Sequence, residues 1–406
     1  MASPSKSKGL SLCVPLCLVA SLAVAACSAT SRKEDSSLAV PTQKPTKVEL
    51  QPTGSQLAGP EPKVLIEGLA GPTQIAFGPS GTWLVAELGG EEPSGDENGS
   101  TGRVLLIDPA TKAQRVLANG LDKPTGVAWI NGVVWIMVRR GIVKLALPAA
   151  PLRSLLAPPA ATAAPEVSVV LSDLPFNGRS EGTLTPFVNG TFLYETTGNI
   201  VNDPGADPAA DPAANPAQAK PEPGSGTLWS FDPQTTKSTA VAVGLKNSYA
   251  HVVLSDGRIA TTEIGDNIAL EPLDEVNILE TVANKESKQP QSFGWPVCDA
   301  SGKPLAKQDT FTCSKATPAW RAFPAHVTPT GIAQYNDDLY VSLFVSGQIM
   351  RLPGDALARK KESIQKRPPM QTFASGLEGP HTLLLDGTRF LVTETTSGRI
   401  VAFDLP

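Results

Sequence analysis

The sequence predicts an all-β fold, a six-bladed β-propeller, and three observations support it. A Gly-Leu phrase recurs, and each copy precedes short runs rich in Val, Ile, Leu and aromatic residues bounded by Gly, Pro or Asp, as in β-strands. No long run with helical spacing competes with these strands. The second and third intervals between phrases are more than twice the first, so each contains one degenerate copy; this gives six units of about four strands. The phrases begin at Gly68, Gly120, Gly244 and Gly376.

The strands follow the same order in each unit. The clearest copies lie at residues 74–77, 83–87 and 104–107 in the first unit and at residues 382–385, 390–394 and 400–404 in the last. The degenerate copies run from Leu174 through residues 192–195 and from Pro329 through residues 339–342. The last unit stops short of a fourth strand. Because a closed ring leaves no edge exposed, we expect Lys63–Ile66 to supply that strand and to join the two ends.

Two segments interrupt the repeat. Residues 202–226 are dominated by Ala, Pro and Asp, and residues 149–165 have a similar composition. Such segments cannot pack a core, so we expect both to be mobile surface loops. The propeller domain is therefore expected to span residues 63–406, with residues 202–226 as a flexible insertion.

The N-terminal residues predict export and a lipid anchor. Lys6 and Lys8 precede an apolar run over residues 10–26, which is the pattern of a signal peptide and is too short for a full membrane span. The end of this run resembles a lipobox, so we expect residues 1–26 to be removed and Cys27 to be lipidated. Since Ser28 follows, the sorting pattern of lipoproteins implies the outer membrane, on the periplasmic side, in a cell with two membranes. An ordinary cleavage site with an incidental cysteine is the alternative.

Residues 27–62 are rich in Ser, Thr, Lys and Pro, which predicts a disordered tether between the anchor and the propeller. The formal net charge of −5 argues against nucleic acid as a partner. Only Cys298 and Cys313 remain in the predicted propeller. In an oxidising compartment we expect them to form a disulfide that closes a loop of about 15 residues, with two free thiols as the alternative.

All three histidines map to one end of the predicted channel. In a propeller the first strand of each unit lines the central channel, and aligning the units places His251 and His381 at the start of that strand. Thr73, Thr125 and Thr330 take the equivalent places, and His326 lies four residues before Thr330. Polar groups that converge on a concave surface favour a functional site, whereas the alternative is that the histidines are structural.

Carboxylates also recur at one register. Glu87, Glu195, Glu263 and Glu394 each end the second strand of a unit, so we expect them to converge near the same end of the channel. Calcium relieves the repulsion between such groups by taking several oxygen ligands. Further oxygens follow in the fourth unit, and the metal-binding candidates are Glu263, Asp266, Asp274 and Glu275, with Asn267 and Asn277 nearby. The alternative is that these glutamates are solvated or bond neighbouring loops.

A series of motifs resembles the glucose and sorbosone dehydrogenase family of propellers that depend on pyrroloquinoline quinone (PQQ). The motifs are residues 244–247, 262–265, 274–277 and 293–296, followed by residues 325–331. The resemblance implies that PQQ and calcium lie at the channel mouth, that a histidine takes the proton of a sugar hydroxyl, and that hydride passes to the quinone. Lys246 and Asn247 correspond to the family's Arg-Asn pair near the cofactor, and His326 and Thr330 are the other candidates for cofactor binding.

The chain departs from that family at the catalytic base. The family's histidine should precede the first strand of the third unit, where this chain has Arg179, Ser180, Glu181 and Gly182. An arginine stays charged and cannot accept the proton. The candidates for the base are therefore His251, His381 and Glu181.

Three hypotheses of function follow. The first is a PQQ- and calcium-dependent dehydrogenase that oxidises a sugar or related alcohol. The second is a non-catalytic propeller that binds a glycan, a peptide or a partner protein at the cell surface. The third is a metal-dependent lactonase, because gluconolactonases are six-bladed propellers that hold one divalent ion in the channel.

Overall fold

The structure of the protein is a computed structural model that describes residues 59–90, 99–147, 152–156, 166–176, 181–198, 224–265, 273–280, 289–298, 300, 302–304, 313–354 and 368–405. The predicted signal peptide, Cys27, the tether up to residue 58 and residues 202–223 of the insertion lie outside the described residues. Within the described ranges, no helix is long and apolar enough to cross a membrane.

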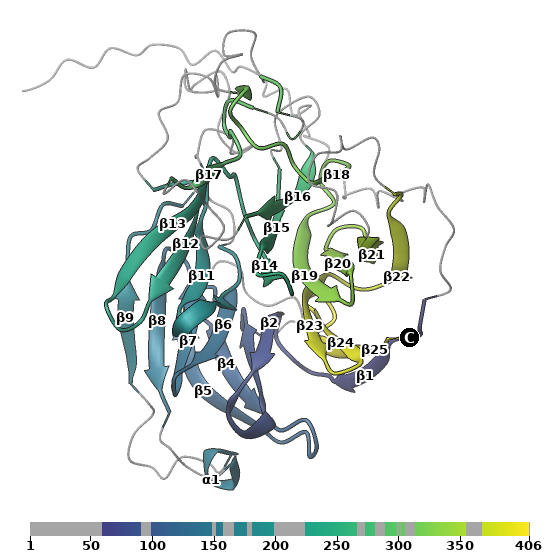
Figure 1. The fold of residues 1–406 in the computed structure, drawn as a ribbon. Coiled ribbons are helices and arrows are strands. Elements are labelled where there is room, and N and C mark those ends of the chain that lie inside the picture. The colour runs from purple at the N-terminus through teal and green to yellow at the C-terminus, as the bar shows by residue number, and fades with distance from the viewer. Residues whose placement is uncertain are drawn as a thin grey trace, which may run out of the picture. The chain divides into compact units, whose positions relative to one another are not determined.

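Six sheets follow one another along the chain around a common centre, which confirms the predicted six-bladed β-propeller (Figure 1). The first blade contains β2 (Pro72–Phe77), β3 (Trp83–Glu87), β4 (Gly102–Ile107) and β5 (Gln114–Leu121). The second contains β6 (Gly126–Ile130), β7 (Val133–Val138), β8 (Gly141–Ala146) and β9 (Val167–Leu171). The third contains β10 (Thr185–Pro186), β11 (Phe192–Thr196), β12 (Thr227–Asp232) and β13 (Lys237–Val243), with β17 (Gln291–Ser292) added in parallel to β13.

The remaining three blades follow the same plan. The fourth contains β14 (His251–Val253), β15 (Ile259–Glu263), β16 (Asp274–Leu279) and β18 (Arg321–Phe323). The fifth contains β19 (Pro329–Tyr335), β20 (Asp338–Leu343), β21 (Gln348–Leu352) and β22 (Gln371–Ser375). The sixth contains β23 (Pro380–Asp386), β24 (Arg389–Glu394) and β25 (Arg399–Asp404). Short 3-10 turns lie at Pro79–Gly81 and Val188–Gly190.

The ring is closed by the N-terminal strand, as predicted. β1 (Lys63–Ile66) pairs antiparallel with β25, with Lys63 opposite Ala402 and Ile66 opposite Ile400. Ile66 is buried in a cluster that includes Leu391. The sixth blade is therefore built from both ends of the domain, and β25 has a partner on each side.

The strands are buried because each sheet packs between two others. All five residues of β3, β11 and β15 are buried. A strand buried on both faces needs no polar alternation, which explains the near-continuous apolar runs in the sequence. The core consists of clusters between neighbouring blades, such as the one that joins Leu84 and Leu106 of the first blade to Val127 and Ile136 of the second.

One predicted loop contains a helix. The short helix α1 (Leu152–Leu156) lies within residues 149–165, and Leu155 is buried in the cluster between the first two blades. The Leu155 carbonyl accepts a hydrogen bond from Arg115. The prediction of a mobile loop is therefore wrong for these five residues, because Leu155 packs against the apolar cluster between the first two blades.

Threonine side chains join neighbouring blades at the start of the innermost strands. The hydroxyl of Thr73 donates to the carbonyl of Pro124 at 2.9 Å, and that of Thr330 donates to the carbonyl of Pro380 at the same distance. Thr125 donates to the carbonyl of Gly182 at 3.1 Å. In each case the acceptor belongs to the next blade, so these threonines join neighbouring blades by hydrogen bonds.

The side chain of Gln74 bonds the two blades that follow its own in the chain. Its Oε1 accepts from the backbone N–H groups of Val127 and Leu184 at 2.7 and 2.9 Å, and its Nε2 donates to the carbonyl of Leu184 at 2.8 Å. Gln74 is 7% exposed, so water cannot replace these bonds readily.

We expect Gln74→Leu to lower the free energy of unfolding by roughly 3–5 kcal/mol, because three buried backbone groups lose their partner. Urea unfolding of the purified domain measures this loss. Gln334→Leu is the matched control, since the amide of Gln334 bonds the exposed groups of Ser255. Equal losses in the two variants would contradict the role given to Gln74.

Candidate functional site at the channel mouth

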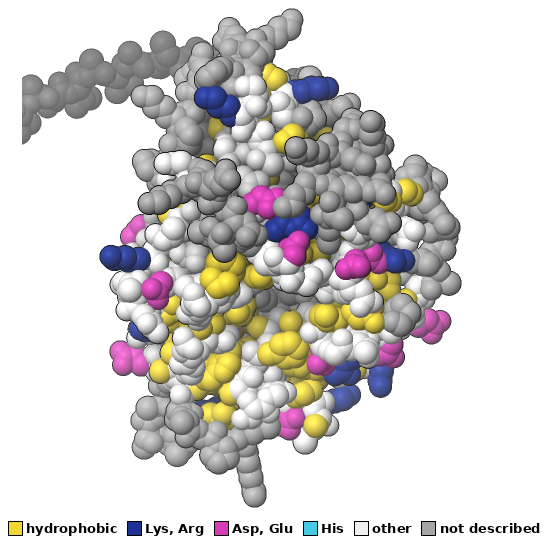
Figure 2. All heavy atoms as spheres, viewed as in Figure 1, with side chains coloured by type: hydrophobic (Ala, Val, Ile, Leu, Met, Phe, Trp, Pro, Cys, Tyr) yellow, Lys and Arg dark blue, Asp and Glu magenta, His cyan; other side chains and the backbone are white. Residues whose placement is uncertain are grey.

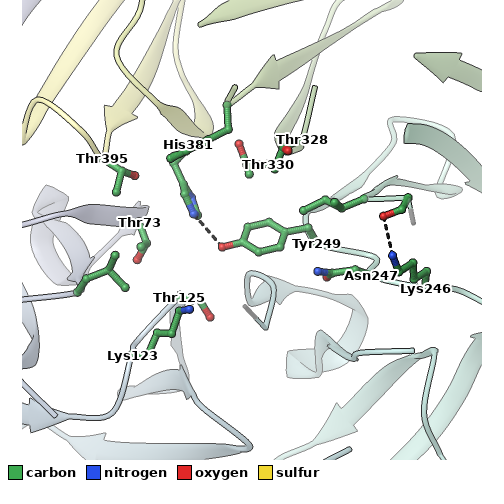
Figure 3. Close-up of a pocket in the computed structure, with 14 residues that line it drawn as sticks. Thr73, Lys123, Thr125, Lys246, Asn247, Tyr249, Thr328, Thr330, His381 and Thr395 are labelled. Atoms are coloured by element: carbon green, nitrogen blue, oxygen red, sulfur yellow. Dashed lines mark hydrogen bonds between the residues drawn. The ribbon is translucent and has the colours of Figure 1, made fainter. Parts of the chain in front are cut away.

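Two cavities occupy the two ends of the channel. The first, here called the mouth cavity, has a volume of about 220 Å³ (Figure 3). The first residues of the innermost strands and the loops beside them line it. It is lined by Thr73, Leu88, Lys123, Thr125, Lys246, Asn247, Tyr249, Ile264, Gly265, Thr328, Thr330, Phe344, His381 and Thr395.

The second, here called the basal cavity, has a volume of about 610 Å³ and is lined by the residues that follow along the same strands, among them Gln74, Ile75, His251 and Leu383. Most of its other lining side chains are apolar. Apolar side chains also gather around the central hollow on the face seen in Figure 2, and most charged groups lie away from it.

The mouth cavity is positively charged. Lys123 and Lys246 line it and are 8% and 4% exposed, whereas no Asp or Glu is among its described lining residues. Asn247 and the threonines add polar groups, and Leu88, Ile264 and Phe344 add apolar faces. Two buried ammonium groups in the lining favour an anionic ligand, and apolar side chains favour one with a flat ring.

Tyr249 and His381 meet inside this cavity. The Tyr249 hydroxyl lies 2.8 Å from Nε2 of His381, and the two rings are in edge contact with centroids 5.2 Å apart (Figure 3). Burial lowers the pKa of His381 to about 3, and a contact with the backbone carbonyl of Thr73 offsets part of this effect. His381 is therefore neutral, and Nε2 is able to accept the hydrogen bond of the Tyr249 hydroxyl.

The predicted grouping of the three histidines is wrong for His251 and His326. His251 lies opposite Thr261 in the ladder and lines the basal cavity, where Ile75 and Leu383 hold the equivalent positions in the first and sixth blades. The two histidines do not hold equivalent positions: His251 lies six residues after the leucine of its Gly-Leu phrase, whereas His381 lies four residues after its own. The matching residues are Ala250 and Thr382, each of which donates its N–H to a threonine hydroxyl of the next strand. His326 is exposed and interacts with Asp274 rather than lining either cavity.

Tyr249 was missed although the repeat points to it. Counting four residues from the leucine of the Gly-Leu phrase leads to Thr73, Thr125 and His381, and the same count from Leu245 leads to Tyr249. Lys123 lies two residues after the leucine of the second phrase and was also missed. Of the predicted cofactor-binding residues, Lys246, Asn247 and Thr330 do line the mouth cavity.

His251 is held as a neutral imidazole. Its Nε2 donates to the carbonyl of Ser248 at 2.7 Å, and its Nδ1 has no hydrogen-bond partner among the described residues. Burial lowers the pKa of His251 to about 4, and the bond to Ser248 offsets part of this effect. Because the folded-state pKa is depressed, the unfolded chain binds the extra proton as the pH falls from about 6.5 to 4.

Relative to His251→Gln, the wild type is therefore expected to lose roughly 3 kcal/mol of unfolding free energy between pH 7 and pH 4. Urea titrations of both proteins across this range measure the difference, which removes the effect of groups that they share. Glu181 and Glu263 have raised pKa values near 7 and contribute in the opposite direction, so the wild type alone is not informative. His326→Gln is the control, because that side chain is exposed. A parallel pH dependence of the wild type and His251→Gln would contradict the buried neutral state.

The four glutamates share a register but do not converge on the cavity. Glu87 accepts from the backbone N–H of Ala70, Glu263 from that of Lys246 and Glu394 from that of Glu378, and each donor follows the leucine of a Gly-Leu phrase. Glu87 also pairs with Arg103, and Glu394 pairs with Arg399. Glu87, Glu263 and Glu394 therefore bond the loops of their own blades, as the alternative predicts, and none of the four glutamates lines the mouth cavity.

The other proposed metal ligands also hold loops. Asp274 accepts from the backbone N–H groups of Gly265 and Thr328, each at 2.7 Å. Glu275 lies opposite Glu263 in the ladder, and Asn277 Nδ2 donates to both carboxylates. Asp266 lies outside the described residues. No group of three or more His, Cys, Asp or Glu in the described part of the chain is placed to hold a metal ion.

Glu181 is buried beside the channel and does not line the mouth cavity. Its Oε1 accepts from the backbone N–H of Arg140. Burial raises the pKa of Glu181 to about 7, and the hydrogen bond from Arg140 and the charge of Lys123 offset part of this effect. Burial raises the pKa of the neighbouring Glu195 as well, and Ser248 donates its N–H to that carboxyl group.

The predicted disulfide is confirmed between Cys298 and Cys313, whose Cα atoms are 5.5 Å apart. Cys298 lies three residues after Trp295, whose backbone N–H donates to the carbonyl of Gly244 at 2.8 Å. The segment around Trp295 therefore packs against the Gly-Leu phrase that precedes Lys246.

Comparison with solved structures supports the fold. The chain is similar to a calcium structure of a Trichoderma reesei carbohydrate-active enzyme of family AA12, with TM-score 0.65 and 16% identity over 88% of this chain and 99% of that one. It is also similar to the PQQ-bound aldose sugar dehydrogenase of Streptomyces coelicolor, with TM-score 0.58 and 15% identity over 86% and 99% of the two chains. The holo PQQ domain of pyranose dehydrogenase from Coprinopsis cinerea matches with TM-score 0.58 and 15% identity over 86% and 98%.

No protein-family model matches the sequence, and no curated protein is similar to it. The chain thus has the propeller fold of PQQ-dependent sugar dehydrogenases, and at these identities the likeness concerns the fold.

Proposed function

We propose that the mouth cavity binds an anionic, planar redox cofactor of the PQQ type and that the protein oxidises a hydroxyl group of a sugar or related alcohol. The observation that carries this proposal is the pair of buried lysines, Lys123 and Lys246, beside Asn247 in a cavity without a described acidic lining residue. PQQ is a flat tricarboxylate, so its charge and shape match these groups and the apolar faces of Ile264 and Phe344. When bound, it accepts the hydride of the substrate.

The chain's own residues supply binding and proton transfer. Lys246 and Lys123 neutralise carboxylates, and the amide of Asn247 orients them. We propose that the Tyr249 oxygen takes the proton of the substrate hydroxyl while the phenolic proton passes to Nε2 of His381, 2.8 Å away. This pair takes the place of the missing histidine, because Glu181 does not line the cavity.

Calcium does not fit the residues that the structure describes. Glu263 and Asp274 already accept backbone or side-chain N–H groups at each carboxylate oxygen, and neither lines the mouth cavity. A cofactor-bound calcium is therefore left out of the proposed function, and no step depends on it.

We further propose that the propeller works outside the cytoplasmic membrane, on a lipid anchor at Cys27. The signal-peptide pattern supports this location, and the disulfide between Cys298 and Cys313 suits an oxidising compartment. Labelling of growing cells with a lipid precursor, with Cys27→Ser as the control, tests the anchor.

The experiment on function uses the purified full-length chain. PQQ is titrated while binding is followed by calorimetry, and dye reduction is then measured across a panel of aldoses and polyols. We expect binding near one molecule per chain and dye reduction with at least one sugar. Failure of PQQ to bind would overturn the proposal.

A second candidate is a non-catalytic propeller that binds an anionic glycan or a partner protein. The position of Glu181 favours this candidate. Glu181 lies where the catalytic histidine of the dehydrogenases was expected, yet it is buried outside the mouth cavity. Binding of an acidic sugar at this cavity, without PQQ binding or turnover, would select this candidate.

A further inference from the structure

Lys246 holds its ammonium group at a fixed point on the wall of the mouth cavity. Its Nζ donates to the carbonyl of Gly265 at 2.8 Å and lies 5.5 Å from the centre of the Trp295 ring. Its own backbone N–H donates to Glu263 at 2.7 Å. The side chain is therefore held at both ends and loses little freedom when a ligand binds.

The surroundings of Lys246 are also fixed. The Trp295 segment is bonded to the Gly-Leu phrase through Phe293 N–H to the carbonyl of Val243, at 3.0 Å, and through Trp295 N–H to that of Gly244. Gly294 has a φ of +93°, and a Cβ there would lie 2.6 Å from Sγ of Cys298, so the turn is tightly packed against the disulfide. The aromatic face under the ammonium group is thus part of a rigid wall.

The Gly265 carbonyl, which accepts the hydrogen bond of Lys246, is a backbone oxygen that a cation could use. Gly265 lines the mouth cavity, whereas the nearby carboxylates of Glu263 and Asp274 do not. A divalent ion at the Gly265 carbonyl would stand next to the lysine ammonium and be repelled by it. The positive charge at this wall is already supplied by the protein.

We infer that the mouth cavity binds its anionic ligand without a divalent cation and that the Lys246 ammonium supplies the fixed charge in place of a metal. This inference rests on the proposed function for the choice of PQQ as probe. It extends to any small carboxylate that fits the cavity, because the recognition is by charge and hydrogen bonding at Lys246.

The test compares PQQ binding by calorimetry in a chelator, EDTA, and in calcium chloride, using the full-length protein. We expect the two Kd values to agree within about threefold, since a shared calcium ion would couple the two binding events by roughly 5- to 150-fold. Tighter binding in calcium by more than threefold would overturn the inference and leave the proposed function intact.

Variants locate the charge. Lys246→Met is expected to weaken PQQ binding roughly 10- to 100-fold, as for the loss of a charge-assisted hydrogen bond, and Lys246→Arg is expected to retain more of the affinity. Lys144→Met is the matched control, because Lys144 also lies over a tryptophan ring, 5.8 Å from the centre of Trp135, and does not line the mouth cavity. Thermal melting confirms that each variant is folded, and unchanged affinity in folded Lys246→Met would overturn the inference.

The outcomes separate the two proposals. Binding in EDTA without oxidation of any sugar supports the metal-free site and overturns the proposed dehydrogenase. Absence of PQQ binding in both buffers overturns both.

Discussion

Deletion of residues 1–66 is expected to destabilise the propeller by roughly 5 kcal/mol or more, whereas deletion of residues 1–58 leaves its stability nearly unchanged. The longer deletion removes β1, which pairs with β25 and places Ile66 in the core beside Leu391 and Ile400. Loss of a buried isoleucine alone costs about 2–5 kcal/mol, and the ladder hydrogen bonds add to it.

The consequence extends beyond one strand, because β25 would become an exposed edge that other chains can pair with. Urea unfolding and light scattering of the two truncated proteins measure stability and aggregation. Ile66→Ala, with an expected loss of about 2–4 kcal/mol, isolates the apolar contact from the hydrogen bonds. If the longer deletion unfolds at the same urea concentration as the shorter one, β1 does not close the ring.

Tyr249→Phe is expected to lower the kcat of the PQQ-loaded protein by roughly 100- to 10,000-fold, the usual contribution of a positioned acid or base. The Kd of PQQ should change little, because the ring and its edge contact with His381 remain. His381→Gln should have a similar effect, and the double variant should be no worse than either single one, since the two residues act as a unit. Dye-linked steady-state kinetics together with calorimetry measure both quantities.

The pH profile provides an independent check of this pair. Because burial lowers the pKa of His381 to about 3, the imidazole stays neutral, and the acid limb of kcat/KM should lie below pH 5 rather than near 6.5. Tyr340→Phe is the matched control, as Tyr340 is a buried tyrosine that packs against Phe373 and Phe390 away from the mouth cavity. Full activity in Tyr249→Phe would exclude the proposed proton path.

Much of the fold was predictable because it repeats. The Gly-Leu phrase, the apolar runs and the spare strand at Lys63–Ile66 are local patterns, and closing the six sheets into a ring buries the faces of each sheet against its neighbours. The same repetition predicted Thr330 and His381 at one end of the channel, and the family resemblance added Lys246 and Asn247; all four line the mouth cavity. The pair Cys298 and Cys313 followed from counting cysteines.

What the sequence could not decide were contacts between distant segments. The repeat count assigns Tyr249 to the position that His381 holds in its blade, but only the folded chain shows that the Tyr249 hydroxyl meets Nε2 of His381 and that His251 lines the basal cavity. Likewise, the glutamates share a sequence register, but only the folded chain shows that Glu87, Glu263 and Glu394 accept a backbone N–H of their own loops and that Glu195 accepts one from the next blade. The charge of the mouth cavity therefore comes from which side chains the tertiary structure turns inward, and two lysines face it where carboxylates were expected.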